Sequence, residues 1–565
     1  MRYRKRAMIV SPQPEATEVG AEMLTAGGNA VDAAMACALV QGVVDPMMCG
    51  IAGFGSCGIA MRGGFHGYLD FHAPAPLAVR PDMWADRIES EARDGYGFIL
   101  RGRVNDLGYQ SICVPASLRA YHDAHREHGR LPWEQVVEPA IAWAEGGWTV
   151  RPHVAAWWAD EGEMGRAANH ERLAFSPASR GLYCRPDGTP KRVGDVVVNR
   201  DLGQTLRLIA KHGDVVFYEG EIAKAIVEDM RRHDGLITSE DLRGWRTVRN
   251  APLWGTYRGY RVSTNRPPGG GVLLLEMLNA LEPFDVKSLG LNSSAEINLV
   301  AGAMKLAFAD RAFYLGDPDY WTVPTEKLIS KEYGAELTDQ LRPPPKWQRA
   351  PWNWDKGWIP KARTASTPPP QDSGTTQISV VDEKGNAVSL TQTVNTLFGS
   401  LITVPGTGIV LNDEMDDFSI APDAPNAWNA VGTAANAIRP GKRPLSSMSP
   451  TIVLDKGQVR YVVGSPMGTV IISAVLQSLL GVIDFKLDPQ AAVSAPRFHH
   501  QWMPDQLIVE SGHPQDVLDK LRAWGHQVAP SPYPLGAVQL IVRDPQSGAW
   551  LGATDPRRDG TALGY

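Results

Sequence analysis

The sequence predicts an α+β protein in which helices cover antiparallel β-hairpins, and three observations lead to this fold class. The first part of the chain carries helical periodicity, most clearly over residues 30–44. A proline-rich segment then interrupts regular structure. Beyond it, apolar stretches are separated by short turn sequences such as Glu383-Lys384-Gly385-Asn386, which indicates hairpins. Hairpins with helices outside them favour α+β layers over a parallel, doubly wound sheet.

Four helices are expected in the first part of the chain. Residues 30–44 are rich in alanine and valine, and Asn29 directly before them is a typical N-cap residue. Helical periodicity also marks residues 133–144, 219–231 and 293–314.

Three hairpins and one more helix are expected in the last part. The hairpins join 377–382 to 387–394, 451–454 to 459–463, and 537–542 to 549–553. The helix covers residues 469–480.

The proline-rich segment, residues 343–374, separates these two parts. It contains Pro343-Pro344-Pro345 and Pro368-Pro369-Pro370. Because proline fixes φ and lacks a backbone donor, we expect a surface connection here. A connection of this length inside an enzyme calls for a purpose.

Composition excludes several classes of protein. The chain has 565 residues and a formal net charge of −6, which gives no reason to expect a nucleic acid or an anionic membrane as partner. Its five cysteines are odd in number and form no CxxC pair, so neither a disulfide framework nor a zinc site is indicated.

The start of the chain does not read as a secretory signal. The basic residues Met1 to Arg6 are followed by an apolar stretch of only Ala7 to Val10 before Ser11-Pro12 ends it. No apolar run reaches the length of a membrane span. The expectation is a cytoplasmic protein without a membrane partner.

Two short patterns receive structural interpretations. Gly53-Phe54-Gly55-Ser56-Cys57-Gly58 matches the dinucleotide pattern GxGxxG, which requires a strand before it and a helix after it. Here a helical run precedes it and a hairpin follows, so we expect a glycine-lined loop where backbones approach closely. His499-His500 has no third ligand at a metal-binding spacing, so no metal site is predicted.

The candidate nucleophile lies where the proline-rich segment ends. Ser373-Gly374-Thr375-Thr376 places hydroxyl residues directly before a strand, which alone is ordinary. Thr375 to Val388 is followed in order by three blocks: Thr391-Gln-Thr-Val-Asn-Thr-Leu-Phe-Gly399, Leu411-Asn-Asp-Glu-Met-Asp-Asp-Phe-Ser419 and Lys442-Arg-Pro-Leu-Ser-Ser-Met-Ser-Pro450. Together these blocks resemble the small subunit of γ-glutamyltransferases (glutathione hydrolases), which belong to the N-terminal-nucleophile hydrolases.

The resemblance covers nearly the whole chain. It includes Gly27-Gly-Asn-Ala-Val-Asp-Ala-Ala34, Met304-Lys-Leu-Ala-Phe-Ala-Asp-Arg311 and Asp555-Pro-Arg-Arg558. It implies a four-layer αββα sandwich whose two sheets are formed by both parts of the chain, and no metal or organic cofactor.

In the family that the chain resembles, the precursor cleaves itself before the nucleophilic threonine. Here this is the Gly374–Thr375 bond, which gives fragments 1–374 and 375–565 that pair as a heterodimer. Cleavage frees the α-amino group of Thr375, whose reference pKa of about 7.7–8 suits a general base. The proline-rich segment then has a purpose, since it can bring the scissile bond into the site and move away afterwards.

The resemblance also implies the remaining site residues. Thr393 is implied to bond the nucleophile, and the backbone N–H groups of Met467 and Gly468 to form the oxyanion hole, where the family usually has two glycines. The Met467 side chain can narrow the acyl pocket. The substrate-binding residues implied are Asn395, Glu414 and Asp417 for the α-ammonium group, and Ser446 and Ser447 for the α-carboxylate.

One departure from the family concerns the substrate carboxylate. The family usually has an arginine in a block resembling Asp-Phe-Arg-Glu, whereas this chain has Asp70-Phe71-His72-Ala73. His72 is a single donor, mostly neutral at pH 7, whereas arginine offers a charged fork. A lost charged hydrogen bond is worth about 1.5–3 kcal/mol, or about 10- to 150-fold in affinity.

Three functions follow from these residues. The first is cleavage of γ-glutamyl amides through a Thr375 acyl-enzyme, with transfer to water or an amine. The second is a same-fold acylase for glutaryl-type or other small amides. The third is an uncleaved, non-catalytic binding protein.

Residues 420–440, which include Trp428, resemble in length and position the lid of the family, and an ordinary surface loop is the alternative.

Overall fold

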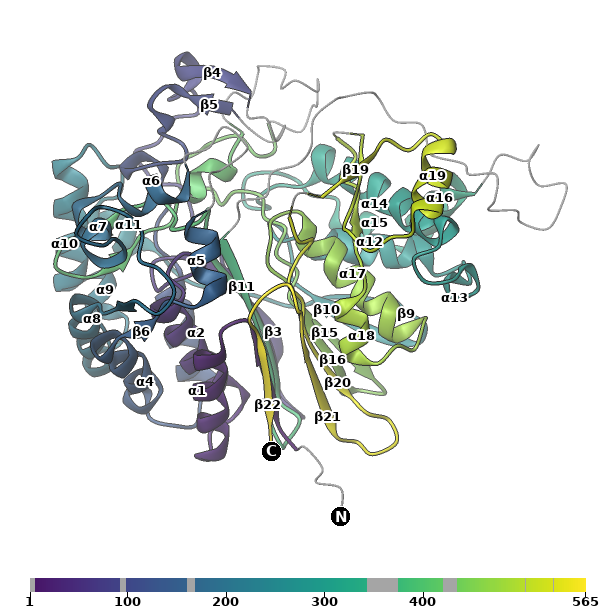
Figure 1. Cartoon of the computed structure of the whole chain (residues 1–565), viewed down its shortest axis with the longest axis horizontal. Helices are drawn as coiled ribbons and strands as arrows, with labels where there is room; N and C mark the ends of the chain where they lie inside the picture. Colours follow the sequence, from purple (N-terminus) through teal and green to yellow (C-terminus); the bar gives the residue numbers. More distant parts are fainter. Residues whose placement is uncertain are drawn as a thin grey trace, which may run out of the picture.

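The computed structural model describes residues 6–91, 98–159, 168–342, 374–419, 434–503, 505–531 and 533–565. Two antiparallel sheets lie face to face, with helices on both outer sides (Figure 1). This arrangement confirms the predicted α+β class and the αββα layers. The proline-rich residues 343–373 and the lid candidate Trp428 lie outside the described residues.

The first sheet has seven strands in the order β22-β1-β11-β12-β2-β3-β8. The chain before Thr375 and the chain after it both supply strands, and β11 from the later part pairs with β1 from the beginning. The strands are β1 (Met8–Ser11), β2 (Phe54–Ala60), β3 (His66–Phe71), β8 (Val248–Asn250), β11 (Gly374–Val381), β12 (Ala387–Asn395) and β22 (Thr561–Gly564).

The second sheet has six strands in the order β21-β20-β16-β15-β10-β9. It too combines both parts of the chain, because β10 pairs with β15. The strands are β9 (Leu253–Tyr257), β10 (Tyr260–Thr264), β15 (Thr451–Asp455), β16 (Gln458–Gly464), β20 (Gln539–Arg543) and β21 (Trp550–Thr554).

Helices cover the outer face of each sheet, and Figure 1 shows the two groups on opposite sides. The group beside the first sheet includes α1 (Pro14–Thr25), α2 (Ala30–Val44), α3 (Ser117–His128), α4 (Trp133–Gly146), α8 (Arg200–His212) and α10 (Glu221–Arg232). The group beside the second includes α12 (Gly271–Leu281), α14 (Ser294–Tyr314), α16 (Lys331–Leu341), α17 (Val470–Ile483), α18 (Pro489–Ser494) and α19 (Gln515–Ala523). In the described ranges, no helix is long and apolar enough to cross a membrane.

Local sequence explains several of these elements. Asn29 caps α2, since its side chain accepts hydrogen bonds from Val31 and Asp32 while Asp32 accepts from the Asn29 backbone. Almost every α2 residue is buried, because this helix lies between the first sheet and the other helices. Apolar residues between the sheets, such as Val10, Ile452 and Ile541, form a separate buried cluster.

The structure corrects the expectation for the glycine pattern at Gly53. Gly55 and Gly58 lie inside strand β2, not in a loop. The expected close approach of backbones is present: a Cβ atom on Gly53 would lie 2.1 Å from the Thr393 carbonyl oxygen, and one on Gly55 2.3 Å from that of Thr391. These glycines therefore let β2 lie against β12.

Candidate active site

The β11–β12 pair brings Thr375 opposite Thr393. Gly374 is paired with Asn395, and the register shifts between Gly374 and Thr375. A register shift of this kind re-aims a side chain relative to the regular ladder. Thr375 is 3% exposed, so the hydroxyl group lies in a buried environment in the uncleaved chain.

The Thr393 hydroxyl group connects the nucleophile to the bond before it. Thr375 Oγ1 donates to Thr393 Oγ1 at 3.1 Å. The Asn395 N–H donates to the same oxygen at 2.8 Å, and Thr393 Oγ1 in turn donates to the Gly374 carbonyl oxygen. One side chain thus holds both the attacking oxygen and the carbonyl group of the predicted scissile bond.

The backbone around this bond is tightly confined. A Cβ atom on Gly374 would lie 2.4 Å from the Met47 carbonyl oxygen and 2.9 Å from that of Thr396, so only glycine fits. Asn395 has φ of +81°, an uncommon conformation for a non-glycine residue. Its amide group donates to the Asp413 carbonyl oxygen at 3.2 Å, which ties β12 to the acidic block that follows.

The acidic block forms the short 3₁₀ helix η6 (Glu414–Asp417). Glu414 Oε2 accepts a hydrogen bond from the Ala73 N–H at 2.7 Å. Burial raises the pKa of Glu414 well above its ordinary value, and the nearby Asp417 carboxylate raises it further. The site therefore concentrates acidic groups beside the segment that contains His72.

His72 is held by a buried chain of charged groups. Its Nδ1 lies 2.7 Å from Asp70 Oδ1, and the other Asp70 oxygen accepts from Arg443 at 2.7 Å. Arg443 also binds Asp317, with Nη2–Oδ1 at 2.6 Å. Burial alone would raise the pKa of Asp70, but Arg443 and His72 hold it below its ordinary value. His72 is 1% exposed, so its ring is an internal group in the uncleaved chain.

Ser446 and Ser447 are buried and lie in the irregular segment that precedes β15. The following residue, Met448, accepts from the Asn265 amide at 2.9 Å, and Asn265 also donates to Ser56 Oγ of β2 at 3.2 Å. Ser56 is the direct neighbour of Thr391 on β12. The two serines are thereby tied to the strands that carry the nucleophile and Thr393.

Asn436 joins the amine-side and carboxylate-side candidates. Its amide nitrogen donates to the Asp417 carbonyl oxygen at 2.6 Å, and its amide oxygen accepts from the Leu445 N–H at 2.9 Å. Leu445 directly precedes Ser446, so one side chain fixes the spacing of the two blocks. The sequence placed Asn436 only within the lid candidate, residues 420–440, and did not predict its contacts with Asp417 and Leu445.

The segment Gly464 to Gly468 connects β16 to α17. Both candidate oxyanion donors have positive φ, +92° for Met467 and +50° for Gly468. For a residue with a side chain this conformation costs about 1–2 kcal/mol. Helix α17 begins at Val470 with Thr469 as its N-cap, so the N–H groups of Met467 and Gly468 belong to the turn that precedes the helix.

The His499-His500 pair is linked through Gln501 to Thr469, the residue that follows this segment. Thr469 Oγ1 donates to Gln501 Oε1 at 2.9 Å, and His499 Nε2 contacts the same oxygen at 2.9 Å. His499 Nδ1 bonds Ser473 at 2.6 Å, while His500 bonds Asp505 and the Trp502 N–H. All four ring nitrogens are engaged within the chain, in agreement with the structural role expected for both histidines.

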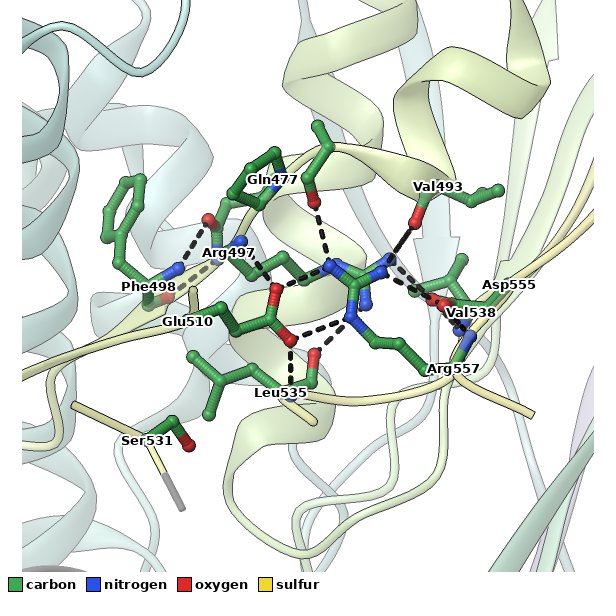
Figure 2. A network of polar contacts seen from close by, with 12 residues as sticks. Gln477, Val493, Arg497, Phe498, Glu510, Ser531, Leu535, Val538, Asp555 and Arg557 are labelled. Atoms are coloured by element: carbon green, nitrogen blue, oxygen red, sulfur yellow. Dashed lines mark hydrogen bonds and ion pairs between the residues drawn. The ribbon is translucent and has the colours of Figure 1, made fainter. Parts of the chain in front are cut away.

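Arg558 contacts the nucleophile residue from the C-terminal end of the chain. Its Nη1 donates to the Thr375 carbonyl oxygen at 2.8 Å. Figure 2 shows the network that fixes the preceding turn: Asp555 binds Arg497 at 2.6 Å, and Arg557 binds both Asp555 and Glu510. Burial lowers the pKa of Arg558, an effect that Asp45 and Asp555 oppose. The block Asp555 to Arg558 was visible in the sequence, but its contact with Thr375 was not.

The chain is similar to known proteins over almost its whole length. A family model described as Gamma-glutamyltranspeptidase matches residues 16–565. The chain is 38% identical to a glutathione hydrolase proenzyme of Escherichia coli, over 99% of this chain and 92% of that protein. It is 35% identical to the Acylase ACY 1 proenzyme of a Pseudomonas species, over 99% of this chain and 93% of that protein. A cephalosporin acylase structure from Bacillus halodurans aligns with a TM-score of 0.83 at 30% identity, covering 100% and 96% of the two chains.

Proposed function

We propose the following function for this chain, which belongs to the γ-glutamyltranspeptidase family: it cleaves itself before Thr375 and then hydrolyses or transfers the acyl group of small amides, with γ-glutamyl amides as the first candidates. The observation that carries the proposal is the Thr393 hydroxyl group, which bonds both Thr375 Oγ1 and the Gly374 carbonyl oxygen.

Self-cleavage begins with attack of Thr375 Oγ1 on the Gly374 carbonyl carbon. The hydrogen bond from Thr393 to the carbonyl oxygen stabilises the negative charge that develops there. The C–N bond breaks as the amide nitrogen of Thr375 takes up the proton that Oγ1 loses, which leaves an ester between Gly374 and the threonine side chain. Water then hydrolyses this ester and releases fragments 1–374 and 375–565, which stay paired as a heterodimer because both contribute strands to each sheet.

Turnover uses the amino group that cleavage creates. With a reference pKa of about 7.7–8, the α-amino group of Thr375 accepts a proton near neutral pH. It accepts the hydroxyl proton of its own side chain as Oγ1 attacks the substrate carbonyl carbon. The amine or ammonia leaving group takes the proton, and the acyl-enzyme passes its acyl group to water or to an incoming amine.

The N–H groups of Met467 and Gly468 serve as oxyanion donors in this scheme. Loss of one such donor costs about 2.7–4 kcal/mol of transition-state stabilisation. The acidic groups Glu414 and Asp417 bind a substrate ammonium group with Asn395, and Ser446 and Ser447 bind a carboxylate.

A glutaryl-type acylase is the second candidate function. It is favoured by His72, which stands where the family usually has an arginine, and by the similarity to the ACY 1 and cephalosporin acylase proteins. The two candidates differ in the acyl group and share the machinery around Thr375.

Thr375→Ala tests the nucleophile. We expect the variant to remain a single 61.5 kDa chain and to have no amidase activity. Thr376→Ala is the matched control, because Thr376 is the next residue on β11 and bonds Gln13 instead of the site. Cleavage that continued in Thr375→Ala would identify another nucleophile and overturn the proposal.

The substrate is tested by p-nitroaniline release from γ-glutamyl-p-nitroanilide, with and without glycylglycine, beside the glutaryl analogue. Turnover of the γ-glutamyl compound that rises with glycylglycine supports a transferase. Turnover of the glutaryl compound alone supports the acylase. Absence of both activities from a cleaved protein would contradict both candidates.

A further inference from the structure

A cleft of about 500 Å³ lies between the hairpin turns of the two sheets. The turns β2–β3 and β11–β12 of the first sheet line it on one side, and the turns β15–β16 and β20–β21 of the second sheet line it on the other. Thr375 lies at the opposite end of β11 from the β11–β12 turn, which places it about 20 Å away at about 3.3 Å per strand residue. The cleft is therefore separate from the candidate active site.

Positive charge is concentrated in this cleft. Four cationic side chains line it: Arg6, Arg62, Lys384 and Arg543. Among the described residues of the lining, Glu383 supplies the one carboxylate. Burial lowers the pKa of His66, which also lines the cleft, to about 4, so this ring is neutral near pH 7. The excess of positive charge stands out because the whole chain has a formal net charge of −6.

Two of these cations are exposed and have donors to offer. Among the described residues, Lys384 Nζ has no hydrogen-bond or ion-pair partner. Arg62 Nη1 donates to the Lys384 carbonyl oxygen at 3.2 Å, which uses one of the five N–H donors of the guanidinium group. This contact also holds the β2–β3 turn beside the β11–β12 turn, so the two cations lie close together.

The other two cations are held by contacts of different strength. Arg6 pairs with Glu383 at 3.5 Å, and their side chains are 66% and 47% exposed. An exposed pair of this kind is worth little, so an anion can replace the carboxylate at small cost. Arg543 is half-buried, donates to Gln458 Oε1, and lies over the Trp550 ring at 5.7 Å from its centroid.

The floor of the cleft is apolar. Ala60, Leu454, Val459 and Trp550 line it, and all four belong to the buried cluster between the two sheets. Apolar walls have a low dielectric constant, so they focus the field of the cations toward the opening and raise the local concentration of anions. The volume also lies within the range of about 300–1,000 Å³ that is usual for small-molecule sites.

We propose that this cleft binds a small anion that carries two or more phosphate or carboxylate groups. Guanidinium and ammonium groups bind both kinds of anion, and several cations around one cleft favour a ligand with several charges. Arg62 belongs to fragment 1–374, whereas Lys384 and Arg543 belong to fragment 375–565, so a bound anion bridges the two proposed fragments. The inference goes beyond the proposed amidase function and does not depend on it.

The test is calorimetric titration of the full-length protein with pyrophosphate and with citrate at constant ionic strength. Comparison of the two affinities distinguishes a phosphate ligand from a carboxylate ligand. We expect saturable binding that weakens as sodium chloride is added, because salt screens exposed charges. Arg62→Gln and Lys384→Gln should each weaken binding by about fivefold, the upper end for an exposed ion pair. Glu383→Gln should strengthen binding, since it removes a repelling carboxylate and releases Arg6.

Arg342→Gln is the matched control and should bind as wild type does, because Arg342 is an exposed arginine outside the cleft that pairs with Asp339. Absence of saturable binding of either anion at millimolar concentration would overturn the inference. Unchanged affinity in both Arg62→Gln and Lys384→Gln would also overturn it, as would an equal loss in Arg342→Gln. Misfolding does not explain tighter binding, so Glu383→Gln separates charge from structure. Loss of the amidase proposal with the expected pattern of affinities would leave this inference standing.

Discussion

Thr393→Val removes the hydroxyl group that links the nucleophile to the bond it is proposed to attack. In the structure this oxygen accepts from Thr375 Oγ1 at 3.1 Å and from the Asn395 N–H at 2.8 Å, and it donates to the Gly374 carbonyl oxygen. Valine has nearly the same shape and none of these hydrogen bonds. Thr393→Ser retains the hydroxyl group and is the matched control.

The size of the effect follows from the groups left without partners. Asn395 N–H and Gly374 C=O are both buried, and each buried group without a partner costs about 1–3 kcal/mol, so we expect a loss of about 2–6 kcal/mol in folding stability. The substitution is also expected to slow self-cleavage. Loss of one oxyanion donor costs about 2.7–4 kcal/mol, which corresponds to cleavage about 10²- to 10³-fold slower.

A time course on a denaturing gel measures this rate as loss of the 61.5 kDa precursor. Thr393→Val should persist as precursor long after wild type and Thr393→Ser are cleaved, while its circular dichroism spectrum stays native. Cleavage of a folded Thr393→Val protein at the wild-type rate would show that this hydroxyl group does not act on the scissile carbonyl. The mechanism proposed here would then be wrong.

Two further predictions concern pH and backbone strain. Burial raises the pKa of Glu296 to about 8, so between its ordinary value of 4.5 and about 8 the folded chain keeps a proton that the unfolded chain loses. The free energy of unfolding therefore falls as pH rises, by about 1.4 kcal/mol per pH unit at most. Thermal unfolding should show that Glu296→Gln gains stability relative to wild type between pH 5 and pH 8. A difference in stability that stayed constant over this range would contradict the prediction. Met467 has φ of +92°, a backbone conformation that glycine adopts without strain. Met467→Gly should therefore be about 1 kcal/mol more stable than Met467→Ala, which also loses the methionine side chain but keeps the backbone strain. The reverse order of stability in denaturant unfolding would refute the prediction.

Local sequence was sufficient to predict most of the elements. The helix at Ala30–Val44 was predicted to the residue, because Asn29 and Asp32 form a capping box whose partners lie within one turn. The hairpin of β11 and β12 followed from a turn sequence between two apolar stretches, although β11 begins earlier than predicted, at Gly374. The candidate nucleophile was also identified from sequence, since its motif is contiguous.

Contacts between distant segments could not be predicted in this way. The glycines from Gly53 to Gly58 looked like a loop, because glycine weakens a strand by itself; only the neighbouring carbonyl groups of β12 explain why this strand needs them. The link from Asp417 through Asn436 to the segment before Ser446, and the contact of Arg558 with Thr375, join groups that carry no shared sequence signal.

The sequence alone thus determined the elements, the αββα class and the candidate nucleophile, since each depends on residues that are neighbours in the chain or on a recognisable order of motifs. Tertiary structure decided which charges face one another. Arg443 forms ion pairs with three aspartates, and His72 Nδ1 contacts Asp70. Arg311 contacts the hydroxyl group of Ser447, although the two residues are more than 100 positions apart in the chain. Which charged groups pair with one another is therefore a property of packing, because electrostatic partners are selected by distance in space.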